Sequence, residues 1–424
     1  MKRNQLPFFR IIRQTFAMLF PFALIGSFAQ MIRYAFLSPE GLFYNIAYFD
    51  QWVPEWLMQG LQGIFTGISR VTFSLFGILV AYAAAKYTAR IYHRDSQIAG
   101  ATGIIVILLI AFRYNITSGG SAMDFNWRIL GAQSLLISLL VGYGVGQIFH
   151  WLGAERNFQR TNHVIGVRER SLLAMRPLLA SICTGILIAL LLNVAWLGKI
   201  IHQSYNQMIS VGQSDHNLLL TILGVTLITF FDWIGLGSVS YTAMALSGGA
   251  YAENLSYALK HGSAWNVPYP FFGGSLYNSF ANFGGNGLIL ALVVAIIIAS
   301  KKEGQHQMAR WTLLPTLFNA GYGALIGLPV IMNPLYLLPI LILPGVNLLI
   351  AAGAIAVHLI PPTPYPALMG TPGPLISFVA SNGNWWSLIF TLALFAFDVW
   401  CFIPFVKVID RYDEQLNDND EEVD

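Results

Sequence analysis

The chain has 424 residues, of which only 10% are charged and 56% are hydrophobic, and its formal net charge is +3. Soluble domains carry more than about twice this share of charged residues. The composition therefore excludes a soluble globular protein and predicts an all-α polytopic membrane protein. The basic residues form no stripe interleaved with aromatic residues, which excludes nucleic acid as a partner.

Apolar segments near 20 residues long follow one another along the chain, as bilayer-spanning helices do. The mean hydropathy of the chain is +0.60. We predict about ten transmembrane helices, over residues 14–36, 66–88, 97–117, 132–152, 173–197, 217–249, 286–300, 311–341, 343–360 and 385–408.

Lys and Arg gather in alternate connections, which predicts the orientation of the spans. Basic residues lie in the N-terminus, after the second and fourth predicted spans, and at 301–310 and 407–411, whereas residues 38–60 contain none. This pattern places both termini in the cytoplasm. Residues 409–424 are expected to form an acidic cytoplasmic tail.

The two halves of the chain differ in texture. Residues 1–200 read as clean spans with short connections, which predicts an N-terminal scaffold or dimerisation domain. Residues 201–408 contain apolar segments broken by Gly, Pro and Asn, and irregular backbone at membrane depth is tolerated where it lines a cavity. Transporters build their midplane sites in this way, so we expect this half to handle a substrate. The broken stretches are GLGSVS at 235–240, PFFGGSLYNSFANFGGNG at 270–287, NAGYGALIGLPVIMNP at 319–334 and PPTPYPALMGTPGP at 361–374.

Ionisable side chains inside spans are costly and indicate function by default. Asp232 lies in the middle of an apolar segment and is either a hydrogen-bond acceptor or cation site for a polar solute, or a cap or ion-pair partner. Asp398 lies closer to Lys407, and for it we favour a structural cap or pair.

Polar and aromatic residues also gather in the broken segments. Asn282, Asn319 and Asn333 each lie near Gly or Pro. An amide suits a hydroxyl-rich ligand, and capping of a half-helix is the equal alternative. Trp233 is a candidate for stacking on a ligand, although an interfacial or core role is as common for such residues.

The two cysteines, Cys183 and Cys401, lie inside apolar segments, which excludes a disulfide framework, a redox pair and a zinc site. We predict neither a metal nor a cofactor. No paired carboxylates or nucleophile–base constellation indicates an enzyme.

The broken segments resemble those of a known family, the membrane (IIC) permease components of the bacterial sugar phosphotransferase system, in the lactose/cellobiose/chitobiose branch. The resemblance covers essentially the whole chain. PFFGGSLYNSFANFGGNG is similar to the family's PFF…F-N-x-GG-x-G segment, and LFNAGYGALIGLPVIMNPLYLLP to its F-N-x-x-E-P-x-x-F-G-x-P-x-x-x-N-P stretch. GTPGPLISFVASNG takes the place of its W-T-T-P-P segment, and FDVWCFIPFVKVIDRYDEQL that of its last span.

The resemblance implies an elevator-type permease fold with two re-entrant hairpins, in which a transport domain moves against a dimeric scaffold in the bacterial cytoplasmic membrane. Its substrate would be an oligosaccharide. A separate cysteine-phosphorylated IIB chain would phosphorylate the sugar at the cytoplasmic face. The partners implied are a sugar, IIB, membrane lipid and a second copy of the chain.

The chain departs from the family's pattern at the residues that bind the sugar. Tyr322 aligns with the family's sugar-binding Glu, Leu236 with its histidine near the phosphorylated hydroxyl, and Met369 with the Trp of W-T-T-P-P, a segment that includes Thr371. Asp232 precedes Leu236 by four residues and would share its helix face if the segment stays helical.

Two hypotheses follow for function. One is a permease with a remodelled site that moves a sugar for phosphorylation by IIB. The other is a degenerate relative, with the IIB partner lost, that serves as a non-phosphorylating sensor, regulator or facilitator. A coupled transporter, in which Asp232 or Asp398 titrates, is a further alternative.

Overall fold

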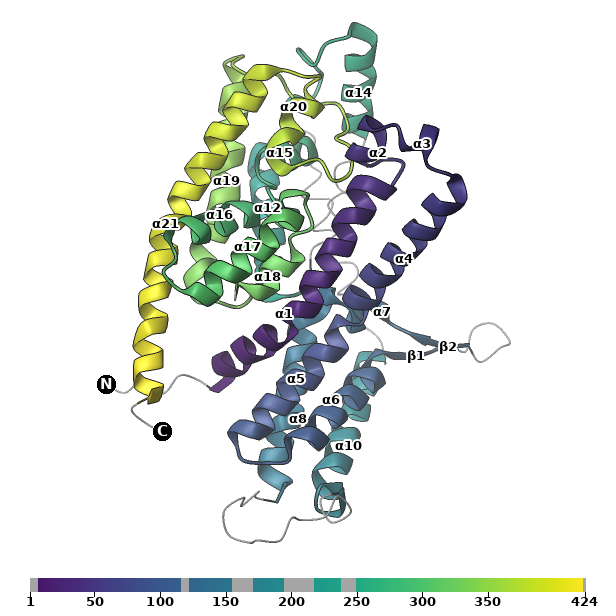
Figure 1. Cartoon of the computed structure of the whole chain (residues 1–424), viewed down its shortest axis with the longest axis vertical. Coiled ribbons are helices and arrows are strands. Elements are labelled where there is room, and N and C mark those ends of the chain that lie inside the picture. The colour runs from purple at the N-terminus through teal and green to yellow at the C-terminus, as the bar shows by residue number, and fades with distance from the viewer. Residues whose placement is uncertain are drawn as a thin grey trace. The chain divides into compact units, whose positions relative to one another are not determined.

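The computed structural model describes residues 7–115, 122–154, 171–193, 217–237, 249–328 and 330–421. By its internal contacts the chain divides into two compact units. Figure 1 shows the chain coloured by residue number. Unit 1 comprises Met1–Pro21, Arg70–Ser204 and Gly235–Gly237, and unit 2 comprises Phe22–Ser69, Tyr205–Ile234 and Ser238–Asp424.

This division differs from the predicted split at residue 200, because Phe22–Ser69 groups with the later half. Specific backbone contacts account for the difference. The backbone N–H of Gly323 donates to Ser27 Oγ over 2.8 Å, and that of Leu42 donates to the carbonyl of Met369 over 2.9 Å. Helix α1 (Pro7–Ile32) consequently passes from unit 1 to unit 2 at Pro21, inside the helix.

Unit 1 is a set of packed helices. Small residues let α5 and α8 approach each other closely, since a Cβ atom added at Gly142 would lie 2.5 Å from the carbonyl oxygen of Ala81. Asp95 caps α6, where its Oδ1 accepts from two backbone N–H groups. The helices are α5 (Phe76–Ile91), α6 (Ser96–Ala111), α7 (Trp127–Leu130), η2 (Ala132–Ser134), α8 (Leu135–Leu152) and α10 (Met175–Asn193).

A β-hairpin follows α6, in strands β1 (Phe112–Asn115) and β2 (Ala122–Phe125), with Phe112 opposite Phe125. The predicted span over 97–117 is therefore wrong beyond Ala111. The helix ends because Phe112 is extended, at φ −69° and ψ 132°. The described part of the chain is otherwise helical, so the expectation of an all-α fold class is confirmed.

Unit 2 is built from long helices and short ones between them (Figure 1). It begins with the second part of α1, from Phe22, followed by η1 (Arg33–Leu37), α2 (Leu42–Ile46), α3 (Phe49–Trp52) and α4 (Glu55–Ser74), whose last residues belong to unit 1. It continues with α12 (Leu218–Ile234), α14 (Gly249–His261), α15 (Gly273–Phe280), α16 (Ile289–Ala299), α17 (Glu303–Leu317), α18 (Tyr322–Gly327), α19 (Pro334–Ala356), η3 (Gly373–Leu375), α20 (Ile376–Ala380) and α21 (Trp385–Glu421).

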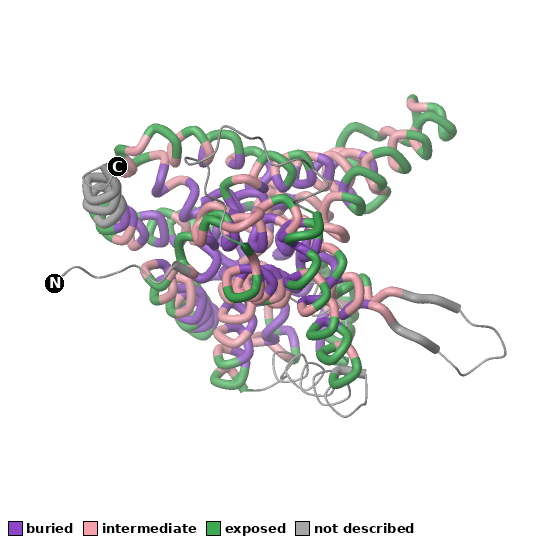
Figure 2. The backbone as a smooth tube through the Cα atoms, turned by 90° about the horizontal axis from the view of Figure 1, so that it is seen from below, coloured by how far each residue is buried: buried purple, intermediate pink, exposed green. Residues whose placement is uncertain are grey.

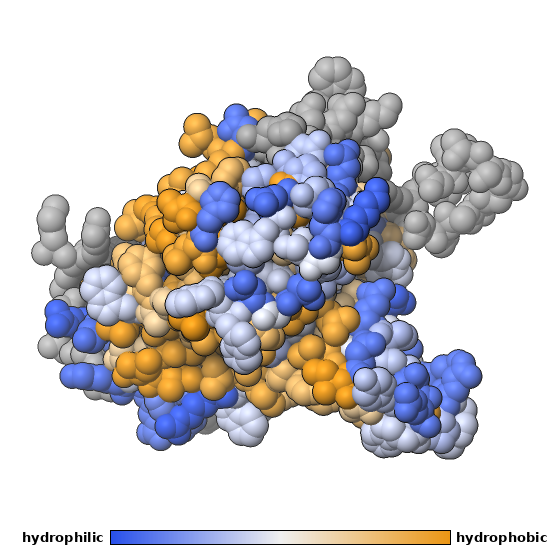
Figure 3. Space-filling model, turned by 90° about the horizontal axis from the view of Figure 1, so that it is seen from above, coloured by the Kyte–Doolittle hydropathy of each residue, from blue (hydrophilic) through white to orange (hydrophobic). Residues whose placement is uncertain are grey.

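The core of unit 2 lies where α12, α15, α19 and α21 meet. Phe280 of α15 and Leu348 of α19 are fully buried there and pack with Val225 and Leu394. Burial of each such side chain contributes about 1.5–3 kcal/mol. The long helices bury one side and expose the other, as Figure 2 shows. Figure 3 shows hydrophobic side chains gathered on one part of the face it presents, beside hydrophilic ones.

Five helical segments in the described part are long and apolar enough to cross a membrane. They are Phe8–Leu37, Glu55–Ile91, Ala132–Leu152, Pro334–Ala356 and Trp385–Arg411. Four shorter apolar helices are Ser96–Ala111, Met175–Leu191, Leu218–Ile234 and Ile289–Ala299. The chain is therefore a helical protein with membrane-spanning segments.

The predicted spans over 311–341 and 343–360 are wrong in their boundaries. The first is broken twice, after α17 and after α18, and its last residues join the second in α19. Asn319 has φ +61°, which ends a right-handed helix. Asn333 caps α19 and Pro334 takes its first position, so the helix begins there.

Candidate functional site

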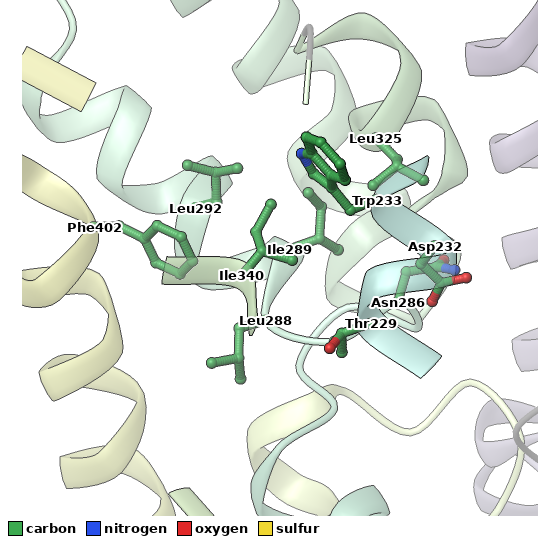
Figure 4. Close-up of a pocket in the computed structure, with 11 residues that line it drawn as sticks. Thr229, Asp232, Trp233, Asn286, Leu288, Ile289, Leu292, Leu325, Ile340 and Phe402 are labelled. Atoms are coloured by element: carbon green, nitrogen blue, oxygen red, sulfur yellow. The ribbon is translucent and has the colours of Figure 1, made fainter. Parts of the chain in front are cut away.

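A small pocket opens in unit 2 where several broken segments converge (Figure 4). Its volume of about 20 Å³ has room for water. It is lined by Thr229, Asp232 and Trp233 of α12, Asn286 to Leu288 of the loop between α15 and α16, Ile289 and Leu292 of α16, Leu325 of α18, Ile340 of α19 and Phe402 of α21.

The polar side chains gather at one side of this pocket. Figure 4 shows Asp232 and Asn286 together on one side and Thr229 nearby, with Leu292 and Phe402 on the other. Asp232 is only 8% exposed, and Thr229 lies three residues before it on α12. The pocket thus offers a carboxylate, an amide and a hydroxyl opposite an apolar wall.

The last turn of α12 is held against the loop that precedes α19. The indole Nε1 of Trp233 donates to the carbonyl oxygen of Asn333 over 3.0 Å. The backbone N–H of Met332 donates to the carbonyl of Trp233 over 2.9 Å. These bonds fix Asp232 and Trp233 at the pocket, because they immobilise the helix end that carries both.

The loop between α15 and α16 depends on glycine. Gly284, Gly285 and Gly287 have positive φ values of 114°, 87° and 63°, which L side chains adopt only with strain. A Cβ atom added at Gly285 would also clash with the backbone of Asn319. The glycines therefore let two broken segments touch through their backbones.

Asn319 joins three of the broken segments. Its Oδ1 accepts from the N–H of Gly284 over 3.1 Å, and its Nδ2 donates to the carbonyl of Thr371 over 2.8 Å. Asn319 does not line the pocket. The side chain therefore positions the loops around the site.

The other predicted residues lie around the pocket's supporting loops. Asn282 is buried, and its Oδ1 has no hydrogen-bond partner in the described part of the chain. Thr371 is buried and its Oγ1 donates to Leu368. Tyr322 is half-buried at the start of α18. Met369 is held by backbone hydrogen bonds, its N–H donating to Glu40.

Leu236 is not brought to this pocket. Helix α12 ends at Ile234, so Leu236 does not share a helix face with Asp232, and that expectation was wrong. Gly235 and Gly237 have φ values of 78° and 64°, which turn the chain away from the helix path. The carbonyl of Gly235 accepts from the N–H of Leu136, so this turn belongs to unit 1.

Two polar residues of the pocket, Thr229 and Asn286, were missed from the sequence. Thr229 precedes Asp232 by three residues, and that spacing places both on one helix face. Asn286 lies in the run GGNG, beside Asn282 in the same quoted segment. Both signals were therefore present. In the described residues no three His, Cys, Asp or Glu side chains group as metal ligands.

The sequence has clear relatives. The family described as "Phosphotransferase system, EIIC" matches residues 13–344. The chain belongs to this EIIC family. EIIC components are membrane permeases, and their phosphotransfer is carried out by a separate IIB domain, so this chain is a transport protein and not an enzyme.

Individual EIIC relatives are distant. The oligo-β-mannoside-specific EIIC component of Bacillus subtilis (strain 168) is 20% identical over 422 residues, which cover 96% of this chain and 91% of that one. The cellobiose-specific EIIC component of Lactococcus lactis subsp. lactis (strain IL1403) is 32% identical over 140 residues, 32% of this chain and 28% of that one. The solved structure of ChbC, the IIC component of the N,N'-diacetylchitobiose-specific system, aligns with a TM-score of 0.44 at 19% identity, over 97% of this chain and 95% of that one.

Proposed function

We propose that this EIIC chain moves an oligosaccharide across the bacterial cytoplasmic membrane and presents it to a separate IIB chain for phosphorylation. The observation that carries the proposal is the pocket beside Asp232, at the convergence of the breaks between α12, α16, α18 and α19. Two relatives are named for oligo-β-mannosides and cellobiose, which supports a β-linked oligosaccharide as the substrate.

The pocket has the chemistry that a sugar requires. The carboxylate of Asp232, the Thr229 hydroxyl and the Asn286 amide can exchange hydrogen bonds with hydroxyl groups. The Trp233 ring and the apolar wall suit the non-polar face of a sugar ring. Since the volume of about 20 Å³ has room for water alone, the sugar-bound state must be more open.

We divide the predicted residues by role. Asp232 and Trp233 contact the sugar directly. Asn282, in the same segment as Asn286, offers a buried hydrogen-bond acceptor. Asn319, Asn333 and Thr371 position the loops, as their hydrogen bonds to other segments indicate. Tyr322, Leu236 and Met369 stand where the resemblance places a Glu, a His and a Trp, and they mark the remodelling of the site.

The finer architecture follows the family pattern in this proposal. Ten spans with two re-entrant hairpins form an elevator, both termini are cytoplasmic, and the protein is a homodimer. The short helices α15 and α18, of 8 and 6 residues, support the hairpins, because neither is long enough to cross a bilayer. Unit 1 would be the scaffold and unit 2 the transport domain, which assigns Phe22–Ser69 to transport.

The test is calorimetric binding of mono- and disaccharides, including cellobiose and mannobiose, to the purified protein. A hydrogen bond to a charged group contributes about 1.5–3 kcal/mol, so Asp232→Asn should weaken binding about ten- to a hundredfold. Thr229→Val should weaken it less. Thr226→Val is the matched control, since Thr226 lies on the same helix outside the pocket and donates to Ile222. Unchanged affinity in Asp232→Asn would refute the site.

The degenerate sensor remains the second candidate because Tyr322 and Leu236 replace the family's Glu and His. Saturable sugar binding by the native protein, together with IIB-dependent phosphorylation of that sugar, supports the permease. Absence of binding by the native protein, with binding restored in Tyr322→Glu combined with Leu236→His, supports a fold retired from transport.

A further inference from the structure

A second polar site lies in the core of unit 2, formed by two residues that do not line the pocket. Asn347 in the middle of α19 and Asp398 in the middle of α21 are both 0% exposed. The Nδ2 group of Asn347 donates to Asp398 Oδ2 over 2.8 Å and to the carbonyl of Phe280 over 3.1 Å. One amide therefore links α15, α19 and α21.

The two remaining oxygens of this pair are unsatisfied. Asn347 Oδ1 and Asp398 Oδ1 each lack a hydrogen-bond partner in the described part of the chain. Buried polar atoms almost always have a partner. An amide carbonyl and an ionised carboxylate both only accept, so these oxygens cannot satisfy each other while Asp398 carries a charge.

The described helices around the pair supply no positive charge. Helices α12, α15, α16, α19 and α20 contain no Lys, Arg or His. On α21 the next basic residue is Lys407, about 13 Å further along the helix axis. The side chains around the pair are mostly apolar, among them Phe280, Leu348 and Leu394.

The other titratable groups of the packed elements are neutral or acidic. Cys401 lies three residues after Asp398 on α21, and Tyr277 of α15 belongs to the same core cluster. Asp232 of α12 lies at the pocket and Tyr336 lies near the start of α19. None of them can balance a carboxylate charge in the membrane interior.

We propose that Asp398 and Asn347 form a proton-binding site within the membrane. One proton on Asp398 Oδ1, donated to Asn347 Oδ1, completes a reciprocal pair in which acid and amide each donate once and accept once. This single ligand satisfies both remaining oxygens and removes an unpaired charge from an apolar core, where such a charge is costly.

A metal cation fits the site less well than a proton. Calcium takes six to eight oxygen ligands and magnesium about six, whereas the pair has two unsatisfied oxygens. The carbonyl of Phe280 already accepts from Asn347. That bond also gives the site a structural consequence, because it holds the last residue of α15 just before Asn282.

Infrared spectroscopy tests directly whether Asp398 carries a proton. The spectrum of the Asp398→Asn variant is subtracted from that of the native protein, both full-length and in lipid vesicles. We expect the carbonyl band of a protonated carboxyl group in the native protein, shifted in heavy water and lost in Asp398→Asn. Asp410→Asn is the matched control. Asp410 is also buried, but it accepts from the Lys301 N–H over 2.8 Å and from Ser300 Oγ over 3.2 Å, as an ionised carboxylate does.

Two further variants extend the test, and the first of them, Asn347→Leu, keeps it decisive if Asp398→Asn does not fold. In Asn347→Leu the acid loses its acceptor, so the Asp398 band should move to higher wavenumber. If Asp398→Asn folds, its melting temperature should match that of the native protein, because an amide reproduces both hydrogen bonds, whereas Asp398→Leu should lower it by several degrees. Carboxylate bands alone in the native protein, or stabilisation by sodium that disappears in Asp398→Asn, would overturn the proposal.

Discussion

The indole of Trp233 donates to the backbone carbonyl of Asn333 over 3.0 Å, across 100 positions of sequence. This bond joins the end of α12 to the start of α19, and the Met332–Trp233 backbone bond reinforces it. The Trp233 side chain, which lines the candidate site, is thereby held in place by the backbone of the break before α19. A ligand that stacks on Trp233 meets a pre-organised ring, and ordering it costs little on binding.

Replacing Trp233 with Phe should destabilise the protein and weaken sugar binding together. The carbonyl of Asn333 loses the indole donor but still accepts from the backbone N–H of Tyr336, so we expect the cost of one hydrogen bond, about 0.5–1.5 kcal/mol. Trp311→Phe is the control, since Trp311 is 63% exposed on α17. Thermal unfolding in detergent measures both variants, and an equal melting temperature for the two would argue against a structural role for the indole N–H.

Asn319→Asp should separate the two hydrogen bonds of this side chain. The carboxylate still accepts from the N–H of Gly284 but cannot donate to the carbonyl of Thr371. We expect a loss of stability of about 1–3 kcal/mol from the unsatisfied carbonyl. Asn382→Asp is the matched control because Asn382 has the same φ of +61° and is exposed. Denaturant unfolding should show a change within about 0.5 kcal/mol for the control.

Substitution of Gly285 and of Gly353 by Ala should act in opposite directions. Gly285 has φ +87° and its added methyl group would clash with Asn319. Backbone strain at Gly285→Ala should lower the stability of the protein by about 1–3 kcal/mol, and the clash would add to this loss. Gly353 lies inside α19 with open space around its Cβ position, so Ala should stabilise the helix by up to about 1 kcal/mol. Expression yield and melting temperature report both effects, and a tolerated Gly285→Ala would contradict the tight loop contact.

Tyr251 should make stability depend on alkaline pH. Burial against Phe272 raises the pKa of its phenol from 10.0 to about 12. Because the unfolded chain ionises first, its stabilising contribution is complete below pH 10 and declines as the pH rises from 10 towards 12. Tyr251→Phe should remove this decline while leaving stability near pH 7 almost unchanged, since the hydroxyl has no partner in the described residues. Melting curves across that pH range in both proteins are the measurement.

Membrane class and family followed from sequence because both are carried by local order. Apolar runs near 20 residues span a bilayer whatever they pack against, and short blocks such as NPLYLLP keep their spacing along the chain. The sequence accordingly predicted that Asp232, Trp233 and the glycine-rich segment around Asn286 belong to the substrate-handling half. Capping of a half-helix was one of two alternatives for Asn333, but the predicted span over 311–341 ran through it, so residue type alone did not place the start of α19.

Tertiary structure alone decided which polar groups meet. The bonds of Asn319 to Gly284 and Thr371 cross 35 and 52 positions, and that between Asn347 and Asp398 crosses 51. Helix periodicity indicates only which residues within a few turns of one helix are neighbours. From it we expected Asp398 to cap a helix or pair near Lys407, and Leu236 to share a helix face with Asp232. In the structure Asp398 is paired with Asn347 instead, and α12 ends before Leu236. The packing of helices distant in sequence determines which buried polar atoms satisfy each other.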